Sequence, residues 1–171
     1  MSGKTRTWAL ISLLVFITTA AFSQAESGKL DIGDSLPVFT LNSETYGTVS
    51  PADLKGKVVL VTLFATWCGP CQLELAEFQE KLYPLYKDNK DFRLLVIGRE
   101  HDDAALAKYN EKKKFSFPLY PDPEREVFSL FAESTIPRTF LFDKEGKLIY
   151  SSLGYTKDGL AKLMNAIEEA L

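Results

Sequence analysis

Two cysteines separated by two residues lie just after a continuous apolar segment, and this arrangement limits the folds that the chain can adopt. The segment KVVLVTLFA (57–65) is rich in β-branched residues, which is typical of a strand buried on both faces. Beyond Cys71, apolar residues recur at helical spacing, at Leu75, Phe78, Leu82 and Leu85. The pair in TWCGPC therefore lies where a buried strand ends and a helix begins.

The remaining elements alternate in the same way. A second apolar strand is expected over 92–98, which makes a parallel strand–helix–strand unit with a right-handed crossover. A helix over 102–114, a short extended piece and a short helix over 127–131 follow. A hairpin that turns at Asp143–Gly146 and an amphipathic helix capped by Thr156 end the chain. We predict an α/β fold with a central mixed sheet flanked by helices on both faces.

The first residues resemble a targeting segment. Lys4 and Arg6 precede an apolar stretch, Trp8–Phe22, that is short for a membrane span, and small residues follow it. We predict a signal peptide over 1–24, or an uncleaved N-terminal anchor, and one domain over 28–171. No cysteine lies near the cleavage site, so a thiol-linked lipid anchor there is excluded.

Net charge narrows the range of partners. The chain has a formal net charge of −3, and loss of Lys4 and Arg6 with the leader makes it more negative. An acidic chain is poorly suited to nucleic acid or to an anionic membrane surface. We therefore expect neither nucleic acid nor anionic lipid as a partner.

Three kinds of site can use a cysteine pair. A structural zinc ion needs four ligands, whereas this chain offers two cysteines and one distant histidine, His101, so we predict no metal. A structural disulfide across a two-residue loop closes almost no chain and adds little stability. A redox pair fits best, because the helix N-terminus favours the Cys68 thiolate and Pro70 suits the first helical turn.

The motif and its surroundings resemble a known group of proteins. TWCGPC after VVLVTLFA resembles the thioredoxin fold, and segments 33–57 and 135–149 extend the resemblance to the exported TlpA/ResA-type thiol–disulfide oxidoreductases, relatives of the AhpC/TSA proteins. The resemblance implies a thioredoxin-like fold with an N-terminal β-extension and a central strand–helix insertion. It also implies a reductase without a cofactor, in which Cys68 is the nucleophile and Cys71 resolves the mixed disulfide.

The same resemblance assigns further site residues. Ile136–Pro137 is expected to be a cis peptide that faces the cysteines and offers its backbone to an extended substrate, with Trp67 flanking the nucleophile. Glu74 matches the position of a glutamate that manages the proton of the second cysteine. The alternative for Glu74 is an ordinary acid in a first helical turn.

Some positions depart from the pattern of that group. Thr62 stands where thioredoxins have a buried aspartate, and a threonine cannot act as a base near neutral pH. Ala76 replaces a helix-kinking proline, so Pro84 is left to bend or end the helix. Arg138, after the expected cis proline, either favours the Cys68 thiolate or is solvated, and His101 is expected to be an ordinary loop histidine.

The function we predict is reduction of protein disulfides outside the cytoplasm, with apo-cytochrome c as one possible client and a membrane protein as electron donor. Two alternatives keep the fold: a disulfide donor or isomerase that uses the same site, and a non-catalytic binding or assembly module. A peroxiredoxin would need a threonine and a proline where the chain has Ala65 and Val61.

Overall fold

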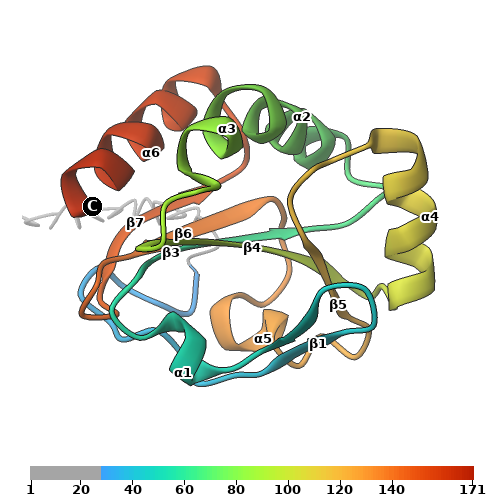
Figure 1. Ribbon diagram of the computed structural model, residues 1–171, viewed down its shortest axis with the longest axis horizontal. Coiled ribbons are helices and arrows are strands. Elements are labelled where there is room, and N and C mark those ends of the chain that lie inside the picture. Colours follow the sequence, from blue (N-terminus) through green and yellow to red (C-terminus); the bar gives the residue numbers. More distant parts are fainter. Residues whose placement is uncertain (1–27) are drawn as a thin grey trace, which may run out of the picture.

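The computed structural model describes residues 28–171, so the predicted leader lies outside the described part (Figure 1). None of the helices in residues 28–171 is both long and apolar enough to cross a membrane. The elements in chain order are β1 (Leu41–Ser43), β2 (Gly47–Val49), α1 (Pro51–Leu54), β3 (Val58–Phe64), α2 (Gly69–Glu77), the π-helical turn η1 (Phe78–Leu82), α3 (Tyr83–Tyr86), β4 (Phe92–Arg99), α4 (Asp103–Lys113), β5 (Leu119–Asp122), α5 (Phe128–Phe131), β6 (Arg138–Phe142), β7 (Leu148–Leu153) and α6 (Lys157–Ala170).

The central sheet is mixed, as the alternation of elements predicted. Its five strands run in the order β5-β4-β3-β6-β7. Strands β3, β4 and β5 are parallel neighbours, whereas β6 is antiparallel to β3 and β7 is antiparallel to β6. The hairpin β1–β2 forms a separate two-stranded sheet, which is the expected N-terminal extension. Strand β3 therefore occupies the centre, and the cysteine motif follows its end.

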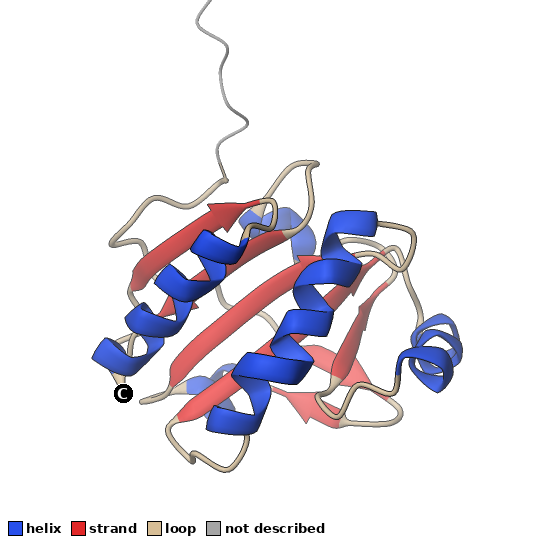
Figure 2. Ribbon diagram, turned by 90° about the horizontal axis from the view of Figure 1, so that it is seen from above, coloured by secondary structure: helices blue, strands red, loops and turns tan. Residues whose placement is uncertain are grey.

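Helices cover both faces of this sheet. Helices α2, α3 and α6 lie across one face, and α1 and α5 lie on the other (Figures 1 and 2). Side chains of β3 alternate between two buried clusters: Val58, Leu60 and Phe64 pack on the side of α2 and α6, and Val59, Val61 and Leu63 on the opposite side. Burial on both faces explains why β3 reads as an unbroken apolar run.

One position in the helix after the motif was predicted wrongly. Leu85 was expected on the buried face, but it is 61% exposed and Tyr86 is buried instead. The cause is the π-helical turn η1, where the Tyr83 amide donates to the Phe78 carbonyl five residues back. This wider turn adds a residue just before Pro84, which has no amide to donate, and so moves the buried position one residue on.

Other local predictions are confirmed. The Thr156 side chain accepts a hydrogen bond from the Gly159 amide and caps α6, as predicted. The helix expected over 102–114 is α4, which the Asp102 side chain caps through the Ala105 amide. Gly146 in the β6–β7 turn has a φ of 75°, a value that a glycine adopts without a steric cost.

Candidate active site

Cys68 and Cys71 form a disulfide at the start of α2, with their sulfur atoms 2.04 Å apart. Cys68 is the N-cap of the helix, and its Sγ accepts a hydrogen bond of 3.2 Å from the Cys71 amide. The helix N-terminus therefore directs an amide at the sulfur, which favours negative charge there. Cys71 is fully buried, whereas Cys68 retains 6% exposure. Cys68 is thus the sulfur that an approaching disulfide can reach.

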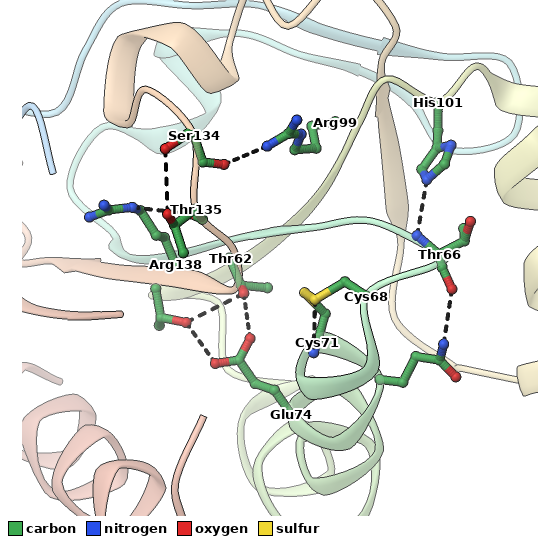
Figure 3. The surroundings of a disulfide bond; sticks show 12 residues. Thr62, Thr66, Cys68, Cys71, Glu74, Arg99, His101, Ser134, Thr135 and Arg138 are labelled. Atoms are coloured by element: carbon green, nitrogen blue, oxygen red, sulfur yellow. Dashed lines mark hydrogen bonds between the residues drawn. A yellow bond between two sulfur atoms is a disulfide. The ribbon is translucent and has the colours of Figure 1, made fainter. Parts of the chain in front are cut away.

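Glu74 lies one helical turn beyond Cys71 and points into the molecule (Figure 3). It is 3% exposed, and its two carboxylate oxygens accept hydrogen bonds from the hydroxyls of Thr62 at 2.8 Å and Thr139 at 3.0 Å. Burial raises the pKa of Glu74 to about 7, although both hydroxyls act in the opposite direction. The alternative of an ordinary acid in a first helical turn, stabilised by the helix dipole, does not fit a buried carboxyl group with a raised pKa.

The threonine pair below Glu74 is produced by the register of the sheet. Thr62 on β3 and Thr139 on β6 are directly opposed partners, and both lie on the face that α2 covers. Thr62 was identified from the sequence as a position that cannot act as a base. The structure shows its other property: the hydroxyl donates to the carboxylate that α2 brings above it.

A small cavity of about 70 Å³ borders Glu74, and neither Cys68 nor Cys71 is among the residues that line it. Its lining includes Tyr150, Ser152 and Tyr155 from β7 and the loop that leads to α6. Apolar side chains, among them Phe78, Leu160 and Leu163, line the rest of it. The carboxyl group of Glu74 is therefore buried but borders a small space beyond its hydrogen-bonding partners.

The loop before β6 completes the site. The Ile136–Pro137 peptide bond is cis, and the Gly154 amide binds the Pro137 carbonyl at 2.9 Å. The Arg99 guanidinium donates to the Ser134 carbonyl (Figure 3). It also lies 5.8 Å from the centre of the Trp67 ring. Arg99 therefore connects the loop before β6 with the exposed indole beside Cys68.

The structure shows the contacts of Arg138 and His101, for which the sequence supplied only general expectations. Arg138 is 4% exposed and its Nε donates to the Thr135 carbonyl, so the solvated reading is wrong. His101 lies in the loop between β4 and α4, as expected, and its Nε2 accepts a hydrogen bond of 3.0 Å from the Thr66 amide, two residues before Cys68. No local signal in the sequence indicated this contact, since it joins segments 35 residues apart.

The described residues provide no alternative metal site. Across residues 28–171, no group of three or more His, Cys, Asp or Glu side chains is placed to hold a metal ion. The chemistry available at the start of α2 is that of two sulfur atoms, one buried carboxyl group and the backbone amides around them.

Comparisons with known proteins agree with this geometry. The sequence matches the model of the AhpC/TSA family over residues 32–151. The chain belongs to the AhpC/TSA family. The thiol-disulfide oxidoreductase ResA of Bacillus cereus is 30% identical over 147 residues, which cover 85% of this chain and 83% of that protein. The relationship therefore includes nearly the whole length of both proteins.

Solved structures of similar proteins show the same fold. A putative protein disulfide isomerase from Bacteroides thetaiotaomicron superposes with a TM-score of 0.81 at 30% identity, covering 85% of this chain and 93% of that one. A putative thiol:disulfide interchange protein DsbE from Chlorobium tepidum gives a TM-score of 0.70 at 26% identity, covering 82% and 98%. The thioredoxin-like fold and the thiol–disulfide oxidoreductase activity are thereby confirmed. The chain is therefore an oxidoreductase of the thiol–disulfide class, and its Cys68 and Cys71 form a disulfide.

Proposed function

We propose that this enzyme reduces disulfide bonds in other proteins outside the cytoplasm, with Cys68 as nucleophile and Cys71 as resolving thiol. The observation that carries the assignment is the hydrogen bond from the Cys71 amide to the Cys68 sulfur at the N-terminus of α2. It lowers the energy of a thiolate at Cys68 and offers nothing similar to the buried Cys71 sulfur.

The reaction follows from these positions. The Cys68 thiolate attacks one sulfur of a substrate disulfide, a new S–S bond forms, and the other substrate sulfur leaves as a thiolate that takes a proton from water. Cys71 then loses its proton and attacks the Cys68 sulfur, which releases the second substrate thiol. The substrate gains two electrons, and Cys68 and Cys71 end as the disulfide seen in the structure.

We assign Glu74 to the second step, the attack of Cys71 on the mixed disulfide at Cys68. A thiol as buried as Cys71 resists ionisation, so its attack needs a proton acceptor nearby. A carboxyl group with a pKa of about 7 is available in both protonation states at neutral pH, and the proton would leave through the small cavity beside it. Thr62 and Thr139 hold the carboxylate in place.

Substrate contacts are assigned to the exposed surface around Cys68. Trp67 is 63% exposed beside the nucleophile, and the Ile136–Pro137 cis peptide lies in the loop that Arg99 connects to it. An extended client segment would pair with the Ile136 backbone as an added strand. Clients are proteins with disulfides, of which apo-cytochrome c is one candidate, and a membrane protein would return the enzyme to its reduced form.

Residues 1–24 are assigned as a signal peptide or N-terminal anchor, and 28–171 as the catalytic domain. The basic start and short apolar stretch of the leader support export. Reduction of disulfides in an oxidising compartment requires electrons from the other side of the membrane, which is why a membrane donor belongs to the proposal.

Trapping tests the order of the two cysteines. Reduced C71S is mixed with insulin and, separately, with a disulfide peptide containing the CxxCH sequence of haem attachment sites. We expect C71S to accumulate a mixed disulfide through Cys68 and C68S to accumulate none. Trapping by C68S and not by C71S would reverse the assignment.

A matched pair of acidic variants tests Glu74. E74Q is expected to resolve a mixed disulfide at least about tenfold more slowly at pH 7, because the proton acceptor is gone. E77Q removes a half-buried acid one turn further on that pairs with Lys81, and we expect a rate within about twofold of the wild type. Equal rates for E74Q and E77Q would remove Glu74 from the mechanism.

A second candidate function is disulfide donation or isomerisation by the same residues. It is favoured by the similarity to the Bacteroides thetaiotaomicron protein, which is described as a putative protein disulfide isomerase. The Gly69–Pro70 dipeptide between the cysteines is the one found in reducing thioredoxins, so reduction remains the proposal.

A further inference from the structure

The loop that carries Trp67 and Cys68 is held by side chains from outside the loop. Thr66 has both backbone groups bound: its amide donates to His101 Nε2 at 3.0 Å, and its carbonyl accepts from Gln72 Nε2 at 3.0 Å. Gln72 is in turn bound by the Lys113 ammonium at 2.8 Å. Figure 3 shows His101 above Thr66, on the side opposite to Glu74. This chain of contacts is separate from the carboxylate cluster under the disulfide.

His101 is rigidly placed for this contact. It lies between the end of β4 and the N-cap of α4, and its carbonyl accepts a hydrogen bond from the Asp122 amide at 3.2 Å. Glu100, just before it, has a φ of 61°, a left-handed conformation that is costly for a residue other than glycine. The Glu100 amide bonds the Asp122 carbonyl at 2.8 Å, which holds the turn. Such backbone strain is concentrated at functional positions.

We propose that His101 is a positioning residue of the thiol–disulfide site, whose neutral imidazole accepts the Thr66 amide and so fixes the loop that places Cys68 at the start of α2. Only the unprotonated Nε2 has a lone pair for this bond, so the neutral ring carries its proton on Nδ1. Protonation replaces the acceptor by a donor that faces another donor. The bond is then lost, and with it the anchor of Thr66.

The surroundings of His101 keep it neutral at pH 7. Burial lowers the pKa of His101 below its ordinary value, and the carboxylates of Glu100 and Asp102 act weakly against this. Two charged groups on neighbouring elements are already bound to other partners. The Asp122 carboxylate accepts hydrogen bonds from the Val127 and Phe128 amides. The Arg99 guanidinium lies over the Trp67 ring and pairs with Glu100. The hydrogen bond from the Thr66 amide to His101 is therefore intact at pH 7 and is lost as the pH falls through the pKa of His101.

The chain contains a single histidine, so its ring can be observed without ambiguity. In a nitrogen-15 NMR titration of the wild type, we expect the Nδ1-protonated tautomer at pH 7 and a pKa below 6.5. The Thr66 amide should shift with the same midpoint. An Nε2-protonated ring at pH 7, or a Thr66 amide that does not follow the imidazole, would overturn the proposal.

Two variants separate anchoring from titration. H101Q keeps an acceptor oxygen near the position of Nε2 but does not titrate, and H101F keeps a ring without an acceptor. The measurement is the rate constant for alkylation of Cys68 by iodoacetamide in the reduced protein, at pH 7 and at one pH unit below the imidazole midpoint found by NMR. At pH 7 we expect H101F to be about threefold to tenfold slower than the wild type, the range for one hydrogen bond, and H101Q to match the wild type.

One pH unit below that midpoint, the wild type should behave like the variant without an acceptor. The wild type then falls to the rate of H101F, whereas H101Q stays about threefold to tenfold faster than both. A ratio of H101F to wild type that equals one at pH 7, or that is the same at both pH values, would contradict the proposal. Equal melting temperatures of H101Q and the wild type serve as the folding control.

The inference rests on the proposed role of Cys68 as attacking thiolate, and the same experiment separates the two. If alkylation, mapped by mass spectrometry, occurs first at Cys71, the assignment of the nucleophile fails. If it occurs at Cys68 with rates independent of residue 101, only the role of His101 fails.

Discussion

At the level of single residues, the site depends on one carboxyl group in a nearly apolar setting. Glu74 is almost completely removed from water, and two threonine hydroxyls only partly replace its hydration. The result is a pKa of about 7 instead of the ordinary 4.5. An acid that ionises near neutral pH is suited to exchange a proton with a neighbouring thiol.

The raised pKa of Glu74 predicts how stability depends on pH. Between pH 4.5 and about 7 the folded protein holds a proton on Glu74 that the unfolded chain has released, so the free energy of unfolding falls as the pH rises through this window. In E74Q this contribution is absent. From pH 4.5 to pH 8 we expect the free energy of unfolding of E74Q, relative to the wild type, to increase by about 3 kcal/mol.

Urea unfolding of the oxidised proteins at both pH values measures this difference. Since all other titrating groups are common to the two proteins, their effects cancel in the comparison. A difference between E74Q and the wild type that does not change with pH would mean that Glu74 has an ordinary pKa.

Removal of the Thr62 hydroxyl should change the pKa of Glu74. T62V replaces the hydroxyl that donates to Glu74 by a methyl group of similar size, so we expect the pKa of Glu74 to rise above about 7. Carbon-13 NMR of the glutamate carboxyl groups measures it. T48V is the matched control, because Thr48 is exposed and its hydroxyl donates to the Asn42 side chain, away from Glu74. A lower pKa in T62V would contradict this electrostatic account.

At the level of elements, the helix that carries the site is divided by the π-helical turn η1. The turn separates α2, which follows Cys68 and holds Cys71 and Glu74, from the short helix α3 that contains Pro84. Phe78 and Leu82 remain buried across this turn. Pro84, which has no amide to donate, then lies in the first turn of α3, where a missing donor leaves no helical hydrogen bond unmade. The geometry near the cysteines is thus protected from the proline further along.

The register after this turn is testable by two alanine variants. Y86A removes a ring that is 7% exposed and packs against Phe92 at 5.2 Å between ring centres, so we expect a loss of about 3 kcal/mol in the free energy of unfolding. L85A removes a side chain that is 61% exposed, and its effect should be within about 0.5 kcal/mol. Thermal and urea unfolding measure both. A larger loss of stability in L85A than in Y86A would instead support an uninterrupted α-helix in which Leu85 is buried.

For the whole molecule, the sequence predicted the order and type of the elements well, because each depended on a local pattern. The apolar run of β3, the caps of α4 and α6 and the turn at Gly146 are short-range signals. The register of α3 was missed because a π-helical turn has no periodic signal of its own.

The site was only partly predictable for a different reason. Cys68 and Cys71 form a local motif, whereas Thr62, Glu74 and Thr139 meet only after β3 pairs with β6 and α2 covers them. The contact of His101 with Thr66 similarly joins the β4–α4 connection to the loop after β3. Such contacts depend on tertiary packing, which one sequence does not display.

The reduction potential of the Cys68–Cys71 pair decides between a reductase and a donor or isomerase. It is measured on the chain without residues 1–24 by equilibration with a glutathione or dithiothreitol buffer of known potential. The proposed reductase predicts a value near or below about −250 mV, in the range of thioredoxin. A value between about −120 and −180 mV, as in disulfide donors and isomerases, would contradict it.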